Sequence, residues 1–74
     1  MKFENIEMLI DGSGKITIGR IGPVRCAAAA SDQDQGLAVL VRQPKESFED
    51  LLARLDSAIE DAVEDQIFID EINI

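Results

Sequence analysis

Three absences narrow what this 74-residue chain can do. It contains no His, which excludes His-based catalysis and ligation of a metal by His. It contains one Cys, Cys26, which therefore has no partner for an internal disulfide. It also lacks a long apolar run: the longest stretches, residues 26–30 and 37–41, have five residues each, whereas a membrane-spanning helix needs about 20.

What the chain does contain is typical of one small folded domain. Apolar residues make up 46% of the sequence, which argues against intrinsic disorder, and the length allows a single domain over residues 1–74. The first seven residues include two acids, and neither the basic region nor the apolar run of a secretory signal is present. We therefore expect a cytoplasmic protein with no membrane partner.

Charge is distributed unevenly along the chain. The formal net charge is −8, but residues 1–45 carry six basic and five acidic side chains, a balance of +1. Residues 46–74 carry ten acidic side chains and one basic side chain, Arg54, a balance of −9. The total disfavours nucleic-acid binding through bulk charge. The division places the acidity in the C-terminal part of the chain.

Two N-terminal segments show the alternation of apolar and polar residues that indicates half-buried strands. Ile6, Met8 and Ile10 alternate within residues 3–10, and Ile16 and Ile18 alternate within a second segment, residues 15–21. Two glycines lie in the Asp-Gly-Ser-Gly connection between these segments, and glycine adopts positive φ at low cost. We therefore predict a hairpin that joins the two segments.

The middle of the chain predicts two further strands. Gly22-Pro23 indicates a turn or the start of a strand. Residues 24–30 include four alanines, which favour helix by propensity, but seven residues without a cap make a poor helix. We interpret them as a strand whose small side chains let a helix pack closely. After a polar turn over residues 31–36, the apolar run 37–41 is typical of a central strand.

The clearest element is an amphipathic helix over residues 47–65. Apolar residues recur there at spacings of three and four, and Ser47 precedes them with Asp50 three positions later, which is a Ser-x-x-acid helix start. The four isoleucines of residues 67–74 favour a C-terminal strand. Continuation of the helix is the alternative, because Ile67 lies four residues after Val63.

These elements predict an α+β domain: a mostly antiparallel sheet of three to five strands with the helix packed on one face. The end of their order along the chain, with three strands, the helix and a last strand, resembles the order in small antitoxins with a partial ribonuclease-H-like fold. The resemblance is architectural and transfers no catalytic residue. Because a core of this size is marginal, we expect a homodimer, formed through the exposed sheet face or the terminal strand.

Sequence motifs for chemistry are incomplete. Gly12-Ser13-Gly14-Lys15 lacks the remaining residues of a phosphate-binding loop, and Asp32-x-Asp34 lacks the Gly and Glu of a calcium loop at the required positions. Cys26 has no His to act as its base, and four carboxylates on one helix without His make a poor metal site. We expect no catalytic residue, no cofactor and no metal, and hence no enzyme.

Two surfaces remain as candidates for function. Acidic side chains of the helix form either a solvated face or a docking surface for a basic protein partner, and we predict the second for Asp56, Glu60, Asp61, Glu64 and Asp65. The alternative is a nucleic-acid-associated or antitoxin-like protein with a basic sheet face. That face would consist of Lys15, Arg20, Arg25 and Arg42.

Overall fold

The computed structural model describes residues 3–72 and contains two helices and four strands within them. Their order along the chain is α1 (Glu4–Asp11), β1 (Lys15–Ile21), β2 (Val24–Ser31), β3 (Gly36–Val41), α2 (Phe48–Asp65) and β4 (Ile69–Asp70). The strands form one sheet in the order β1-β2-β3-β4, in which β4 is parallel to β3 and the other pairs are antiparallel.

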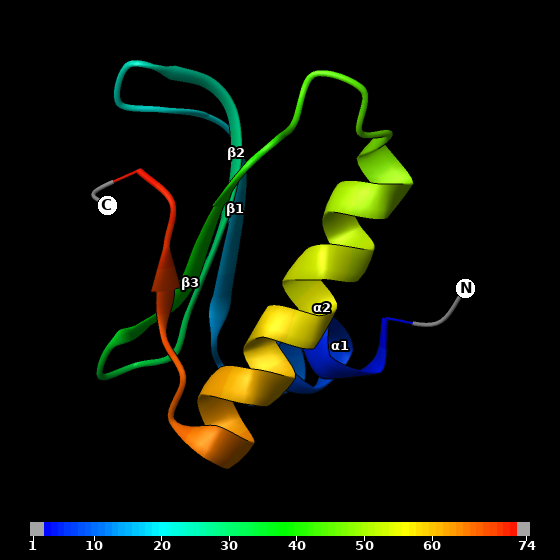
Figure 1. The fold of residues 1–74 in the computed structure, drawn as a ribbon. Coiled ribbons are helices and arrows are strands. Elements are labelled where there is room, and N and C mark those ends of the chain that lie inside the picture. The colour runs from blue at the N-terminus through cyan, green and yellow to red at the C-terminus, as the bar shows by residue number, and fades with distance from the viewer. Residues whose placement is uncertain (1–2, 73–74) are drawn as a thin grey trace.

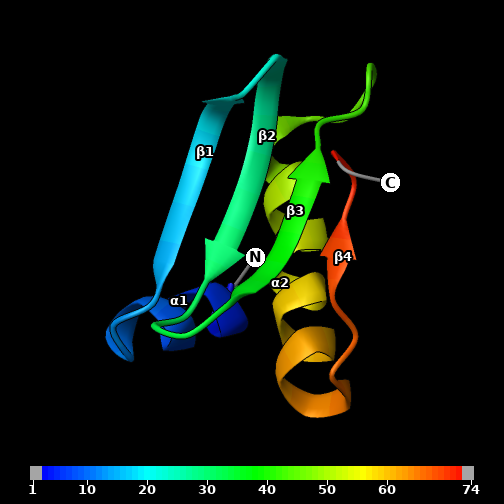
Figure 2. The ribbon, with the colours of Figure 1, turned by 90° about the vertical axis from the view of Figure 1, so that its left-hand side faces the viewer.

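Both helices lie on the same face of the sheet. Figure 1 shows α2 running across this face, and Figure 2 shows the opposite face, which neither of the two helices within residues 3–72 covers. The predicted class is confirmed: the domain is α+β, with a mostly antiparallel sheet and a long amphipathic helix packed on one side. The second helix was not expected.

The core is the contact between α2 and the central strands. Leu51, Leu55 and Ile59 of α2 have no exposed surface. Opposite them, Ala28 and Ala30 of β2 are also buried. Because alanine side chains are short, the helix can approach the sheet closely there, so the interpretation of residues 24–30 as a strand with small side chains is confirmed.

The start of α2 follows the predicted capping pattern. The Ser47 side chain accepts a hydrogen bond from the backbone N–H of Asp50 at 3.0 Å. The helix ends at Asp65, and Gln66 adopts the left-handed conformation with φ of 57°. A short strand follows, so the strand expected over residues 67–74 is present only as β4, and residues 73–74 lie outside the described residues.

Helix α1, Glu4–Asp11, occupies most of residues 3–10, and the prediction of a strand there was wrong. Ile6 and Leu9 pack against the core, whereas Met8 and Ile10 are more than half exposed. The inward-facing residues therefore repeat at a spacing of three, which is typical of a helix. The alternation of Ile6, Met8 and Ile10, on which the strand was predicted, combined one inward-facing residue with two that face solvent.

A side chain from α2 explains why this short helix is stable. Phe3, at the N-cap position, gives no side-chain cap. The Asp56 carboxylate accepts hydrogen bonds from the backbone N–H groups of Asn5 and Ile6, both at 2.9 Å, and from Asn5 Nδ2 at 3.0 Å. These amides are among the first four of α1, which have no partner within the helix. Asp56 therefore caps α1 from 50 residues away in the sequence.

The predicted hairpin was also placed wrongly. The hairpin of the structure joins β1 to β2 through Gly22 and Pro23, with Gly22 at φ of 57°, a sign that suits the tight turns of hairpins. Residues 12–14 instead connect α1 to β1, and Ser13 rather than either glycine has positive φ there. Gly14 lies against Leu9: a Cβ at Gly14 would be 2.8 Å from the Leu9 carbonyl oxygen.

Candidate functional site

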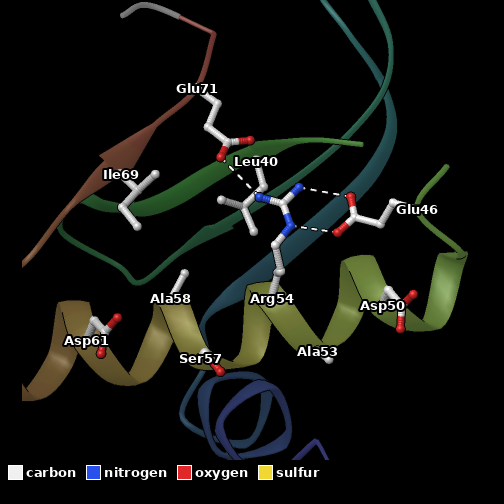
Figure 3. Close-up of a pocket in the computed structure, with 10 residues that line it drawn as sticks. All are labelled: Leu40, Glu46, Asp50, Ala53, Arg54, Ser57, Ala58, Asp61, Ile69 and Glu71. Carbon is white, nitrogen blue, oxygen red and sulfur yellow. Dashed lines mark hydrogen bonds and ion pairs between the residues drawn. The ribbon is translucent and has the colours of Figure 1, made fainter. Parts of the chain in front are cut away.

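A network of hydrogen bonds and ion pairs around Arg54 joins α2 to the C-terminal end of β3 and to the segment after β4 (Figure 3). Arg54 Nε and Nη2 donate to the two carboxylate oxygens of Glu46 at 2.6 and 2.9 Å. Nη1 donates to Glu71 Oε2 at 3.0 Å, and Nη2 also donates to the carbonyl oxygen of Val41 at 2.9 Å. One guanidinium thus connects the loop before α2, the end of β3 and the segment after β4.

The two carboxylates of the network also bind the backbone. Glu46 Oε1 accepts from the N–H of Gln43 at 3.0 Å, and Glu71 Oε1 accepts from the N–H of Val41 at 2.7 Å. The backbone N–H of Glu71 donates to the carbonyl of Val39 at 2.9 Å, which extends the pairing of the short C-terminal strand. The network therefore holds β4 and the segment that follows it against β3.

Electrostatics favours the charged forms of the closest pair. The hydrogen bond from Arg54, supported by the one from the Gln43 amide, lowers the pKa of Glu46 from 4.5 to about 2. The same hydrogen bond to Glu46 raises the pKa of Arg54 above its ordinary value. The Glu46 side chain is 9% exposed and that of Arg54 is 35% exposed, so the ion pair lies at the border between core and solvent.

An open groove of about 510 Å³ lies between α2 and β4, beside this network. We call it the α2–β4 groove, and it is lined by Leu40, Glu46, Asp50, Ala53, Arg54, Ser57, Ala58, Asp61, Ile69 and Glu71. Four of these side chains are apolar. The others include four carboxylates and one guanidinium, so the charge of the lining is −3. A groove with apolar surface and excess negative charge suits a cationic group attached to an apolar stem.

The five predicted acidic residues do not form a single surface. Asp61 is half-buried and lines the α2–β4 groove. Glu64 and Asp65 are exposed and lie three and four residues after Asp61, so they continue its negative surface on the last turns of α2. Glu60 is also exposed and adjoins this surface through Glu64, four residues after it. Asp56 lies about 140° around the helix from Asp61, since five residues separate them, and caps α1 instead.

The four basic candidates are also divided. Lys15 pairs with Ser31 at one end of the sheet. Arg25 lies six residues before Ser31 on β2, so it is about 20 Å from Lys15 along the strands. Arg20 and Arg25 flank the hairpin turn at that far end. Arg42 lies after β3, where its Nε donates to the carbonyl of Glu46 at 2.9 Å. The structure therefore brings three of the four to one end of the sheet and leaves Lys15 at the other.

A second cavity contains the single thiol. It measures about 600 Å³, and both Cys26 and Glu46 are among its lining residues. The Glu46 carboxylate already accepts hydrogen bonds from Arg54 and from the Gln43 amide. A carboxylate so engaged, with a pKa of about 2, is a poor general base for a neighbouring thiol.

Residues 3–72 contain neither a cluster of metal ligands nor a helix suited to crossing a bilayer. No three His, Cys, Asp or Glu side chains are placed to hold a metal ion there. In the same part of the chain, neither helix has the length and apolar character needed to cross a bilayer.

Sequence reasoning missed the Arg54 network and therefore the position of the groove. Arg54 is eight residues from Glu46 and 17 from Glu71, spacings that no helical or strand pattern brings together. One signal was available: Arg54 is the only basic residue in the acidic C-terminal part of the chain.

Comparisons of the chain with protein-family models, with curated proteins and with solved structures gave no match.

Proposed function

We propose that this protein is a small non-enzymatic interaction protein that binds a basic segment of a protein partner. The binding surface in this proposal is the α2–β4 groove together with the acidic end of α2. The observation that carries it is the groove lining, which combines apolar side chains with a net charge of −3. A Lys or Arg side chain matches both features, because its stem is apolar and its end group is cationic.

The charges next to the groove support the same proposal. Glu60 and Glu64 are four residues apart, as are Asp61 and Asp65, and each such pair of like charges destabilises the helix by about 0.2–0.5 kcal/mol. No hydrogen bond or ion pair from within the described part of the chain engages these four side chains. A cationic partner would relieve this repulsion, and the extended negative surface would accelerate its approach at low salt.

Binding of defined probe peptides tests the proposal. The probe is an amphipathic peptide of alternating Lys and Leu, and the comparison probe has Glu in place of Lys. We expect the Lys peptide to shift the backbone NMR resonances of Ser57, Asp61 and Ile69, and we expect its affinity to fall with salt. The Glu peptide should leave these resonances unchanged.

Matched variants separate a specific site from bulk charge. Asp61→Asn and Asp34→Asn remove the same charge, one from the groove and one from the exposed β2–β3 turn. We expect only Asp61→Asn to weaken the Lys peptide, by about fivefold or more, because one charged contact is worth about 1 kcal/mol or more. Equal weakening by both variants, or resonance shifts spread over the whole surface, would show that the acidic face is merely solvated.

A further inference from the structure

The outer edge of β1 and the surface beside it are incompletely covered. β1 is an edge strand of seven residues, so one side of its backbone pairs with β2, and no element within residues 3–72 pairs with the other. Figure 2 shows α1 at the end of β1 where the strand begins, whereas α2 lies behind the other strands. Ile16, near α1, packs against the core, but Ile18 is 37% exposed.

Sequence features leave this edge open to pairing. Edge strands are commonly protected by charged side chains, proline or a bulge. In β1, Lys15 and Arg20 stand near the ends, and the bulge lies between Gly19 and Ile21. Residues 16–19 therefore present an uncharged and regularly paired stretch at the edge.

Helix α1 carries an exposed apolar side chain on the same side. Asn5 faces α2, because its Nδ2 donates to Asp56. Ile10 follows five residues later and is therefore about 140° around the helix, on the side directed away from α2, near the end of α1 that leads into β1. Ile10 is 52% exposed. Glu7 lies near Ile10 on this side, three residues before it.

We propose that a second copy of this chain pairs with β1, antiparallel, about a two-fold axis at Ile18. Such an axis is perpendicular to the sheet, so the helices of both copies remain on the same face. Each Ile18 then lies opposite its symmetry mate. The N-terminal end of one β1 lies beside the C-terminal end of the other, which brings each α1 to the part of the partner strand that its own α1 leaves uncovered. The result is one continuous sheet of eight strands.

Apolar contacts and complementary charges both favour a second copy of the chain as the partner of this edge. The pairing buries the two Ile18 side chains against each other at the axis and places each Ile10 near the C-terminal end of the partner's β1, all on the helix side of the sheet. The same arrangement brings Arg20 of each copy close to the acidic α1 of the other, which carries Glu4, Glu7 and Asp11. The surfaces are thus self-complementary in apolar character and in charge.

This interface differs from the ones expected from the sequence. β4, at the opposite edge of the sheet, has only two residues and offers little backbone for pairing. The proposed dimer leaves both α2–β4 grooves accessible, and it does not rest on the proposed binding function.

Sedimentation equilibrium of the full chain tests the proposal over about 5–200 µM, the range that covers micromolar dissociation constants. We expect a dimer that Ile18→Lys weakens at least about tenfold, because a charge at the two-fold axis enters the interface twice. Ile67→Lys is the matched control: Ile67 is 51% exposed but lies after α2, away from β1. A wild-type chain that stays monomeric throughout, or a control variant that weakens the dimer equally, would overturn the proposal.

Cross-linking tests the register in a Cys26→Ala background, which removes the native thiol. Ile18→Cys should form a disulfide-linked dimer rapidly, because the two thiols face each other. Arg20→Cys should not, because the two Arg20 positions would be four residues, or about 13 Å, apart, beyond the span of a disulfide. Equal rates of cross-linking for the two variants would contradict the pairing at Ile18.

Discussion

Removal of the Asp56 carboxylate should detach α1 from the rest of the protein. In Asp56→Ala the backbone N–H groups of Asn5 and Ile6 lose their charged acceptor, and Asn5 Nδ2 loses its partner. α1 has eight residues and no side-chain cap of its own, so it is too short to be stable alone.

The magnitude follows from the number and kind of lost contacts. A helix cap contributes about 0.5–2 kcal/mol, and a hydrogen bond to a charged group about 1.5–3 kcal/mol. The two amides lie at a helix end, where water can partly replace the carboxylate, so we expect the free energy of unfolding to fall by about 2 kcal/mol. For a domain of this size, the melting temperature should fall by about 8–16 °C.

Urea denaturation followed by far-UV circular dichroism measures this change at pH 7. Asp56→Asn should fall between wild type and Asp56→Ala, because its amide oxygen still accepts a hydrogen bond but carries no charge. Glu60→Ala, on the exposed side of α2, removes an equal charge without a contact and is the control. An Asp56→Ala protein within about 0.5 kcal/mol of wild type, the range of ordinary surface substitutions, would refute the capping role.

Two further predictions concern Glu46 and Gly14. Because the folded state lowers the pKa of Glu46 from 4.5 to about 2, its contribution to stability is present above pH 4.5 and is lost as the pH falls toward 2. The urea midpoints of wild type and Glu46→Gln should therefore differ most at pH 7 and converge as the pH falls through about 2, and a difference independent of pH would contradict this. Gly14→Ala should lower the free energy of unfolding by about 1–3 kcal/mol, because its Cβ would overlap Leu9. Gly36→Ala, where a Cβ meets open space, is the control, and equal urea midpoints for the two alanine variants would argue against this overlap.

Prediction from sequence succeeded where a segment's environment is uniform along its length. α2 buries one side along most of its length, and Ser47 caps it from the adjacent position in sequence. The helical spacing of its apolar residues and the position of its first residue could therefore both be predicted. The strand over residues 37–41 was predicted for the same kind of reason, since its apolar run lies in the sheet between β2 and β4.

Prediction failed where distant groups decide the local structure. Residues 3–10 include both buried and exposed apolar side chains, so their pattern matched a strand as well as a helix. The carboxylate that stabilises the helix lies on α2, 50 or more residues away. Contacts between residues distant in sequence also divide the predicted acidic site. Asp56 accepts hydrogen bonds from α1, whereas Asp61 lines the α2–β4 groove together with Glu46, Arg54 and other residues.

The amino-acid sequence by itself determined the composition of this protein's chemistry: no His, one Cys, and an acidic C-terminal part with one basic residue. It also determined the α+β class, because hydrophobic periodicity is a local property that a single segment displays. Only the tertiary structure decided which charges act as internal contacts and which remain on the surface. The physical reason is that hydrogen bonds and ion pairs act over a few ångströms in space, and the fold brings together Arg54, Glu46 and Glu71 regardless of their separation along the chain.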